Sequence, residues 1–401
     1  MDNPIFSKCK NFTEAKTVRA SGLYPFFRPI EKSEGTIVTI DGKRLIMLGS
    51  NNYLGLANDQ RLKEASEDAL LKYGTSCSGS RFMNGTLDLH EKLEEKLAQF
   101  VNKEAALCFT TGYQTNLGSL FAMLDRSDHV IVDRYNHASI MDGIFLAQGS
   151  KRDINLHRFK HNDMIDLEKI LAKIPIDEGK LIVVDGVFSM EGDITPLVEI
   201  RALADKYKCG VYLDEAHALG VIGDSGRGTC EHWGGNFELA DLTMCTFSKS
   251  FGSIGGFVAG KEDVIDYIKH FARPLIFSAS MPPANIAAAM KALEIMTKEV
   301  DLIKNLQENA SYLREAFSAN GFDIGTTETP IVPLLIKDNE KTFMLWKNVF
   351  EKGVYVNPVV SPAVPPQRAL IRTSCMATHT KSELDQAIEI ISAEAKKLAI
   401  I

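Results

Sequence analysis

The feature that most constrains this chain is the stretch of residues 210–260. It contains two short apolar runs, 211–213 and 242–247, which predict buried strands. The first run ends on Asp214, and the second is followed by Lys249 and a glycine-rich loop. Because α/β proteins bind ligands at the carboxyl ends of their strands, we expect both charged residues to meet in one crevice.

An aspartate and a lysine in such a crevice fit the chemistry of pyridoxal phosphate. The lysine amine holds the cofactor aldehyde as a Schiff base, and the carboxylate partners the pyridine nitrogen. Each residue alone also has an ordinary explanation, because aspartate often caps helices and a lysine in a Ser/Gly loop is usually exposed. The pairing of Asp214 with Lys249 therefore gains its weight from the rest of the chain.

Length and composition define the broad class of protein. The chain has 401 residues, 45% hydrophobic and 24% charged, which predicts a globular protein of about two domains. The net charge of −7 argues against a nucleic-acid-binding surface but leaves room for a local basic patch that binds CoA. The seven cysteines contain no CxxC pair, so we expect reduced thiols and neither disulfides nor a metal site. With no signal-peptide pattern and no membrane-spanning apolar run, we expect a cytoplasmic protein, and peripheral contact with the inner membrane face stays open.

The N-terminal region contains an unusual apolar segment. Residues 1–20 predict an amphipathic helix, and residues 36–48 alternate around Asp41-Gly42 as a hairpin does. Between them lies segment 22–30, GLYPFFRPI, which we call the strap. The strap either packs on the body of the protein or forms the lip of an apolar substrate tunnel.

Two glycine-containing segments are candidates for ligand contact. Residues 74–90 form a Gly/Ser-rich loop that includes Arg81, and such loops approach a ligand or a partner subunit closely, although a plain surface loop is the alternative. Within residues 105–116, a predicted strand leads through Gly112 into the start of a helix. Free backbone N–H groups and the helix dipole favour an anion there, so we expect the cofactor phosphate at Gly112 and Tyr113.

Strands and helices alternate from residue 105 to 260 and predict an α/β region with a mainly parallel sheet. His137 lies just beyond the predicted strand 129–133. A lone histidine is more often structural, but at a strand's carboxyl end its imidazole can stack on a cofactor ring. The predicted strand 181–185 leads into a segment that carries Ser189.

The last part of the chain predicts a loop or strand at 273–283, a helical stretch at 284–320 and a final helix at 381–398. Proline-rich and strand-like segments lie between the last two. Arg372 falls inside the apolar run LIRTSC, where a charge needs a partner. That partner is either an internal carboxylate or a substrate carboxylate held by two hydrogen bonds, and this residue alone does not decide between them.

Several segments together carry a family resemblance. They are SNNYLGL, GSRFMNGTLDLHEKLE, TTGYQTN, NHASI, FSMEGD, DEAHALGVIG, TFSKSFGSIGGFVAG and LIRTSCMATHT, in that order. The chain resembles the α-oxoamine synthases, fold-type I pyridoxal-phosphate enzymes, over nearly its whole length. The resemblance implies a large domain with a mainly parallel seven-stranded sheet flanked by helices, and a smaller α+β domain. We expect an N-terminal segment at 1–55, the large domain at 56–290 and the small domain at 291–401.

The resemblance also implies roles for single residues. Lys249 would carry the cofactor, Asp214 would pair with its ring nitrogen, and His217 would hydrogen-bond its phenolic oxygen with Ser189 nearby. His137 would stack on the ring and help to hold the substrate. Lys249, Asp214, His217 and His137 are thus the expected catalytic residues.

The remaining expected contacts surround the phosphate and the substrate. The phosphate would be bound by Gly112, Tyr113 and Thr246. Ser278 would reach the phosphate of a neighbouring subunit, which implies a homodimer. Arg372 would bind the amino-acid carboxylate, and Arg81 is a further candidate for substrate binding.

The implied reaction is a decarboxylative condensation of an amino acid with an acyl-CoA. Lys249 would remove the Cα proton, and the resulting carbanion would attack the thioester. The likeness is greatest to family members that join L-serine to palmitoyl-CoA, a long-chain acyl-CoA, and release 3-ketodihydrosphingosine, the first step of sphingolipid synthesis. The alternatives are 2-amino-3-ketobutyrate CoA ligase, 8-amino-7-oxononanoate synthase and a non-catalytic partner subunit. No single residue selects serine.

Overall fold

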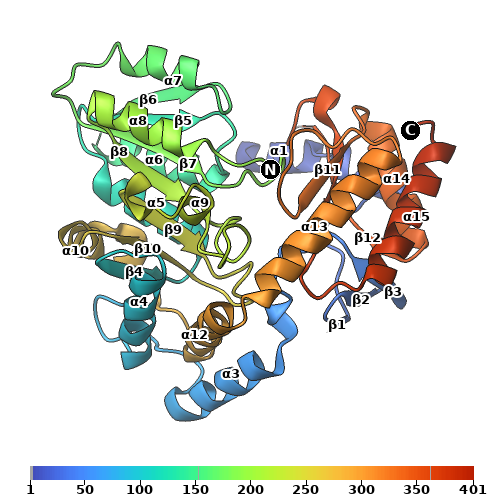
Figure 1. Cartoon of the computed structure of the whole chain (residues 1–401), viewed down its shortest axis with the longest axis horizontal. Helices are drawn as coiled ribbons and strands as arrows, with labels where there is room; N and C mark the ends of the chain where they lie inside the picture. The colour runs from blue at the N-terminus through green and yellow to red at the C-terminus, as the bar shows by residue number, and fades with distance from the viewer. Residues whose placement is uncertain (1–2, 152, 362) are drawn as a thin grey trace.

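The larger lobe of the molecule is built on a seven-stranded sheet in the order β4-β10-β9-β8-β7-β5-β6. The computed structural model describes residues 3–151, 153–361 and 363–401. Only β10 runs antiparallel to its neighbours, so the predicted mainly parallel seven-stranded sheet is confirmed (Figure 1). The strands are β4 Ala105–Phe109, β5 His129–Asp133, β6 Asn155–Phe159, β7 Lys180–Asp185, β8 Gly210–Asp214, β9 Leu242–Thr246 and β10 Gly256–Gly260.

Alternating side chains of these strands fill two separate cores, one on each face of the sheet. Val130 and Val132 pack with residues of the helices α5, α6 and α10, whereas Ile131 packs with residues of α7 and α8. This division follows from the two-residue period of a strand, which sends successive side chains to opposite faces. The helices are α5 Gly112–Met123, α6 Ala138–Lys151, α7 Met164–Leu171, α8 Leu197–Tyr207 and α10 Glu262–Phe271.

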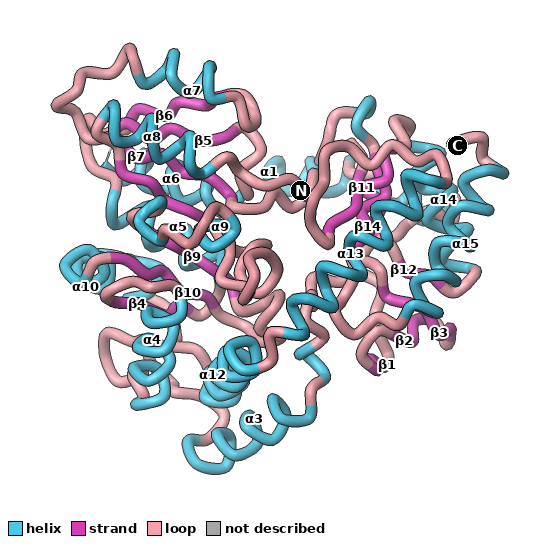
Figure 2. The backbone as a smooth tube through the Cα atoms, viewed as in Figure 1, coloured by secondary structure: helices cyan, strands magenta, loops and turns pink. Residues whose placement is uncertain are grey.

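The smaller lobe combines the two ends of the chain (Figure 2). The predicted hairpin is present as β2 Ile37–Ile40 and β3 Lys43–Met47, and β3 pairs in parallel with β12 Val354–Tyr355. A second sheet has the order β11-β14-β13, in which β14 carries Arg372. The other elements are β1 Lys32–Glu34, β11 Ile331–Leu335, β13 Asn357–Val359, β14 Leu370–Ser374, α13 Asp301–Ala319, α14 Asn339–Glu351 and α15 Lys381–Lys397. The domain division at residues 55 and 290 stays a prediction.

Some predicted elements differ from those observed. The N-terminal helix is two helices, α1 Pro4–Asn11 and α2 Glu14–Ala20, while residues 1–2 lie outside the described residues. The helical stretch at 284–320 is also two helices, α12 Pro283–Lys298 and α13, because Glu299 leaves helical geometry with φ −113° and ψ 63°. Residues 273–283 begin with a short helix, α11 Arg273–Ile276, rather than a strand.

Helix α14 was not predicted, although its start carries a recognisable signal. The Asp338 side chain accepts a hydrogen bond from the backbone N–H of Lys341 at 2.8 Å, which is an N-terminal cap. Helix α3 spans Gln60–Tyr73, and α4 spans Asp88–Phe100. In the described part of the chain, no helix is both long and apolar enough to cross a membrane.

Candidate active site

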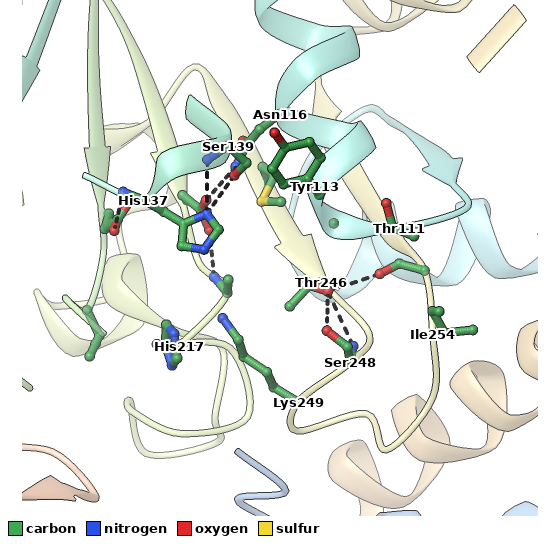
Figure 3. Close-up of a pocket in the computed structure, with 17 residues that line it drawn as sticks. Thr111, Tyr113, Asn116, His137, Ser139, His217, Thr246, Ser248, Lys249 and Ile254 are labelled. Atoms are coloured by element: carbon green, nitrogen blue, oxygen red, sulfur yellow. Dashed lines mark hydrogen bonds between the residues drawn. The ribbon is translucent and has the colours of Figure 1, made fainter. Parts of the chain in front are cut away.

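A cavity of about 260 Å³ lies at the carboxyl ends of β8 and β9. It brings together seven residues that were predicted to form the site, drawn in part in Figure 3: Gly112, Tyr113, His137, Asp214, His217, Thr246 and Lys249. They come from segments spread over residues 112–249, and the parallel strand order is what places their ends along one edge.

Asp214 and Lys249 form the charged centre of this cavity. Asp214 ends β8 with only 3% of its surface exposed, and its carboxylate accepts hydrogen bonds from Asn116 Nδ2 at 2.8 Å and from the backbone N–H of Ala216 at 2.9 Å. Burial lowers the pKa of the Lys249 amine to about 8, although Asp214 opposes the shift. Near neutral pH a minor part of the amine is therefore neutral, far more than for an ordinary lysine, and the neutral form is the nucleophile and proton acceptor.

The start of α5 forms a narrow cradle beside this pair. A side chain at Gly112 would place its Cβ only 2.5 Å from Thr246 Cβ, so the position requires glycine. Thr246 Oγ1 lies 2.9 Å from Ser248 Oγ, and both face the cavity. The exposed N–H groups of this helix start and the two hydroxyls suit a phosphate group.

Two residues predicted near the phosphate make other contacts in the single chain. The Tyr113 phenol donates a hydrogen bond to Asp142, so its ring forms one wall of the cavity. Ser278 does not line the cavity, but its Oγ accepts a hydrogen bond from Gln114 Nε2 at 3.0 Å, which places it beside the start of α5.

Arg372 is 4% exposed and does not line the cavity, and it is connected to the site through its hydrogen-bond partners. Its Nε donates to the Ser189 carbonyl at 2.6 Å, and its Nη2 donates to Asn51 Oδ1 at 3.0 Å and to the Tyr53 hydroxyl at 3.3 Å. Among the described residues, no carboxylate forms an ion pair with this guanidinium. The internal salt bridge considered from the sequence is therefore not found there, and a substrate carboxylate remains the fitting partner.

His217 is connected to Arg372 through Tyr53. The Tyr53 hydroxyl accepts from Arg372, and its proton has two acceptors within reach, His217 Nδ1 at 2.7 Å and Asn51 Oδ1 at 3.4 Å. The shorter contact assigns the proton to His217. Burial lowers the pKa of His217 well below its ordinary value, and Lys249 adds to the effect. His217 is thus a neutral imidazole whose Nε2–H can donate to an oxygen of a bound ligand.

Arg81 and Ser189 do not line the cavity. The Arg81 guanidinium makes two hydrogen bonds to Glu94, at 2.6 and 3.0 Å, and both side chains are largely buried. This pairing leaves Arg81 little capacity to bind a substrate, so that role has no support in the single chain. Ser189 contributes its backbone carbonyl to Arg372 rather than its hydroxyl.

Sequence reasoning missed several lining or neighbouring residues, among them Tyr53, Asn116, Ser139 and Asp185. Tyr53, Asn116 and Ser139 lie inside motifs that the sequence singled out, but their importance depends on contacts between distant segments. Asp185 ends β7 directly opposite Asp214 on β8, and its position at a strand end was a usable signal.

The residues present fit pyridoxal phosphate in kind and arrangement. The amine of Lys249 faces the same cavity as the carboxylate of Asp214, and the phosphate cradle is one that a single Cβ at Gly112 would fill. In the described residues, no group of histidine, cysteine or acidic side chains could hold a metal ion.

Residues 43–391 match the family model for aminotransferase class I and II, and the chain belongs to this family. It is 50% identical over 385 residues to the serine palmitoyltransferase of Sphingobacterium spiritivorum, covering 96% of this chain and 95% of that protein. It is 42% identical over 385 residues to the 8-amino-7-oxononanoate synthase of Thermoanaerobacter pseudethanolicus, covering 96% of each.

The fold is also similar to a solved serine palmitoyltransferase variant from S. paucimobilis with a bound PLP–myriocin aldimine. The TM-score is 0.93 at 34% identity, with 99% of each chain covered. These comparisons confirm the resemblance to the α-oxoamine synthases and the fold predicted from it.

Proposed function

We propose that this enzyme condenses L-serine with palmitoyl-CoA to give 3-ketodihydrosphingosine, CoA and carbon dioxide. The observation that carries the proposal is the placement of Arg372, free of any carboxylate among the described residues, in a network that leads through Tyr53 and His217 to the cavity of Lys249 and Asp214. This arrangement suits an α-amino acid, whose carboxylate and α-carbon need those two kinds of group. The choice of serine and palmitoyl-CoA rests on relatives such as the S. spiritivorum enzyme.

Pyridoxal phosphate would be held by Lys249, by Asp214 at the ring nitrogen, by His137 and His217 around the ring and by Gly112, Tyr113 and Thr246 at the phosphate. When bound, it supplies an electron-poor ring that stabilises negative charge at the substrate α-carbon. We place Ser189 and Ser278 as supporting contacts of this site.

The chain's own groups account for the proton and bond changes. The neutral Lys249 amine accepts the α-proton of serine, while Arg372 holds the carboxylate. A bond then forms between the serine α-carbon and the thioester carbonyl carbon, and the C–S bond breaks to release CoA. The bond to the carboxylate carbon breaks next, carbon dioxide leaves, and a proton replaces it.

The contacts and exposure of the strap residues favour a long-chain acyl-CoA over a thioester that ends in a carboxylate. Arg28 was the residue that could have served the terminal carboxylate of a succinyl or pimeloyl thioester, but its guanidinium binds Asp41 at 2.6 Å and lies over the Phe350 ring at 4.9 Å. Phe27 is 93% exposed with a strained φ of 56°, and the strap surrounds its own pocket rather than the cavity of Lys249. We propose that the exposed strap aromatics contact the acyl chain.

The substrate test is a comparison of acetyl-, succinyl-, pimeloyl- and palmitoyl-CoA with serine. We expect the highest kcat/KM for palmitoyl-CoA, because each methylene gains about 0.8 kcal/mol on leaving water. The double variant Phe26→Ala/Phe27→Ala should lose about tenfold in kcat/KM with palmitoyl-CoA but little with acetyl-CoA.

A preference for pimeloyl-CoA would instead favour 8-amino-7-oxononanoate synthase, the function of the 42% identical relative. If the double variant prefers palmitoyl-CoA as strongly as the parent does, the proposed reaction stands, but the strap does not contact the acyl chain.

We also propose a homodimer with sites at its interface. Large apolar side chains are exposed near the site on the Gly/Ser-rich loop and beside Ser278, namely Met83 at 76% and Phe277 at 78%. Their exposure in the single chain is what a partner subunit would relieve.

Sedimentation should therefore give twice the mass of one chain. Phe277→Asp is expected to shift the protein toward monomer and to reduce activity, because a charge would be buried at the interface. Ile165→Asp, at an exposed position on α7, is the matched control and should remain dimeric. A fully active monomeric parent would refute the shared site.

The location we propose is the cytoplasm, with peripheral contact at the inner membrane face. Helix α1 exposes Ile5 and Phe6 and carries Lys8 and Lys10 in its last turn, a combination suited to an anionic lipid surface. Co-sedimentation with anionic vesicles tests this contact, and equal recovery with neutral and anionic vesicles would argue against it.

A further inference from the structure

A chain of buried hydrogen bonds runs along the cavity and ends on His137, and Figure 3 labels three of its members, Asn116, Ser139 and His137. The Tyr212 hydroxyl lies 2.9 Å from Asn116 Oδ1, and Asn116 Nδ2 lies 2.8 Å from both Asp214 Oδ2 and Ser139 Oγ. Ser139 Oγ lies 2.7 Å from His137 Nδ1. Tyr212 and Asn116 are 0% exposed and Ser139 is 1% exposed, so water does not compete for these contacts.

The direction of each hydrogen bond in this chain follows from the chemistry of its members. The carboxylate of Asp214 only accepts, so the nitrogen of the Asn116 amide must face it, and the amide oxygen must accept from Tyr212. The second N–H of Asn116 then donates to Ser139 Oγ. The single hydroxyl proton of Ser139 is left to point at His137 Nδ1.

The backbone adds a second donor at the same ring nitrogen. The N–H of Ser139 lies 3.3 Å from His137 Nδ1. With two donors directed at it, Nδ1 must carry a lone pair, and the ring proton must lie on Nε2. Among the described residues, Nε2 has no hydrogen-bond partner, and the imidazole lines the cavity.

We propose that Ser139 and Asn116 are positioning residues that hold His137 as a neutral imidazole with its proton on Nε2, directed at the ligand. His137 then serves as a hydrogen-bond donor to an anionic oxygen of the substrate and not as the base that removes the α-proton. The donation from His137 to the substrate rests on the proposed function, whereas the assignment of the His137 tautomer does not.

The groups around His137 agree with a neutral ring. Burial lowers the pKa of His137 and Lys249 reinforces the shift, whereas Asp214 and Asp142 oppose it. Asp185 faces the backbone of His137, whose N–H lies 3.2 Å from its Oδ2. If Nδ1 carried the proton, it would donate to Ser139 Oγ, and the Ser139 hydroxyl proton would have to point elsewhere. Asn116 already donates an N–H to the same oxygen, so that oxygen would then face two donors.

A purely local explanation is that His137 Nδ1 only caps the start of α6 through the Ser139 N–H. This contact needs no hydroxyl and no Asn116, so it predicts that Ser139→Ala leaves the ring unchanged. The two explanations therefore differ in a spectroscopic result.

The test is long-range ¹H–¹⁵N NMR of the histidine rings in the full-length protein, with the His137 signals assigned by their loss in His137→Gln. We expect an unprotonated Nδ1 and a protonated Nε2 in the parent over the neutral pH range. Ser139→Ala should give a mixture of tautomers and a higher titration midpoint, and Ser139→Thr, which keeps the hydroxyl, should restore the parent pattern. Ser392→Ala removes another buried hydroxyl, on α15, and should change nothing at His137.

Asn116→Asp is the second variant, because a carboxyl group beside Asp214 has at most one proton, which it shares with the Asp214 carboxylate, so no second donor is left for Ser139. We expect it to release the Ser139 hydroxyl from its fixed direction and to move the His137 signals as Ser139→Ala does. In kinetics, Ser139→Ala should reduce kcat/KM for serine by about tenfold and move the acidic limb of the pH profile to higher pH.

A His137 tautomer and titration that are the same in the parent, Ser139→Ala and Asn116→Asp would overturn the inference. Because the NMR measurement needs no turnover, it stands apart from the proposed reaction. If the variants alter the His137 signals but the parent makes no 3-ketodihydrosphingosine, the proposed substrates are rejected and the positioning role is kept. If the variants leave the signals unchanged and the parent makes this product, the positioning role is rejected and the proposed substrates are kept.

Discussion

Lys249→Ala is expected to lose the covalent cofactor linkage and to reduce activity by about 10³-fold or more, because the site would lose both its amine nucleophile and its base. Lys249 is the amine that lines the cavity beside Asp214, and burial lowers its pKa to about 8. Borohydride reduction followed by peptide mass mapping measures the linkage, and the serine-dependent reaction measures the activity.

Two control variants separate this effect from a general loss of charge. Lys249→Arg keeps a cation but cannot form the linkage, and it should be as inactive as Lys249→Ala. Lys261→Ala changes an exposed lysine outside the cavity and should keep both properties. Retention of the reducible linkage in Lys249→Ala would show that another amine carries the cofactor.

The same pKa predicts a pH dependence for loading of the cofactor-free protein. The protonated amine cannot attack an aldehyde, so the fraction of reactive Lys249 should rise as the pH increases through about 8. The rate of linkage formation with added pyridoxal phosphate should follow that fraction.

Asp214→Asn is expected to slow exchange of the serine α-proton by about 10²–10³-fold while the cofactor still binds. A carboxylate stabilises a protonated ring nitrogen, and an amide does not. Loss of the α-proton signal of serine in D₂O, followed by NMR, measures this step without the thioester. Equal exchange rates in the variant and the parent would show that Asp214 is not the ring-nitrogen partner.

Asp185→Asn provides a closely matched control. Asp185 lies opposite Asp214 on the neighbouring strand and lines the same cavity. Burial and the charge of Asp214 raise the pKa of Asp185 well above its ordinary value, which favours the neutral form of this carboxyl. Asparagine keeps a group of the same shape there, and we expect a much smaller loss of exchange rate than in Asp214→Asn.

The central charges of the site could be predicted because they follow strand ends. Asp214 and Lys249 each come directly after a short apolar run, and the rule for parallel sheets places such residues on one edge. Gly112 could be placed for a similar reason, since a strand leads through it into a helix start that exposes backbone N–H groups to an anion, although such a junction is a weak signal by itself.

The supporting residues could not be predicted because their roles depend on pairings between distant segments. Asn116 contacts Asp214, which is 98 residues away, and Arg372 contacts Tyr53 across 319 residues. Arg81 is the reverse case, a predicted substrate contact that pairs with Glu94 in the single chain. Its partner Glu94 lies 13 residues further along, on a helix whose orientation toward the loop the sequence does not reveal.

The helix breaks were missed for a more local reason. The periodic pattern at 284–320 continues through Glu299, and only the non-helical backbone at that residue separates α12 from α13. Helix α14 was hidden between proline-rich segments that favoured strands, although the cap at Asp338 marks its start.

Product identification by mass spectrometry tests the central claim most directly. The cofactor-loaded protein would be given L-serine with palmitoyl-CoA and, separately, L-alanine with pimeloyl-CoA. The proposed function predicts 3-ketodihydrosphingosine from the first pair, with one CoA and one carbon dioxide released per molecule. No product from that pair, together with 8-amino-7-oxononanoate from the second, would contradict it.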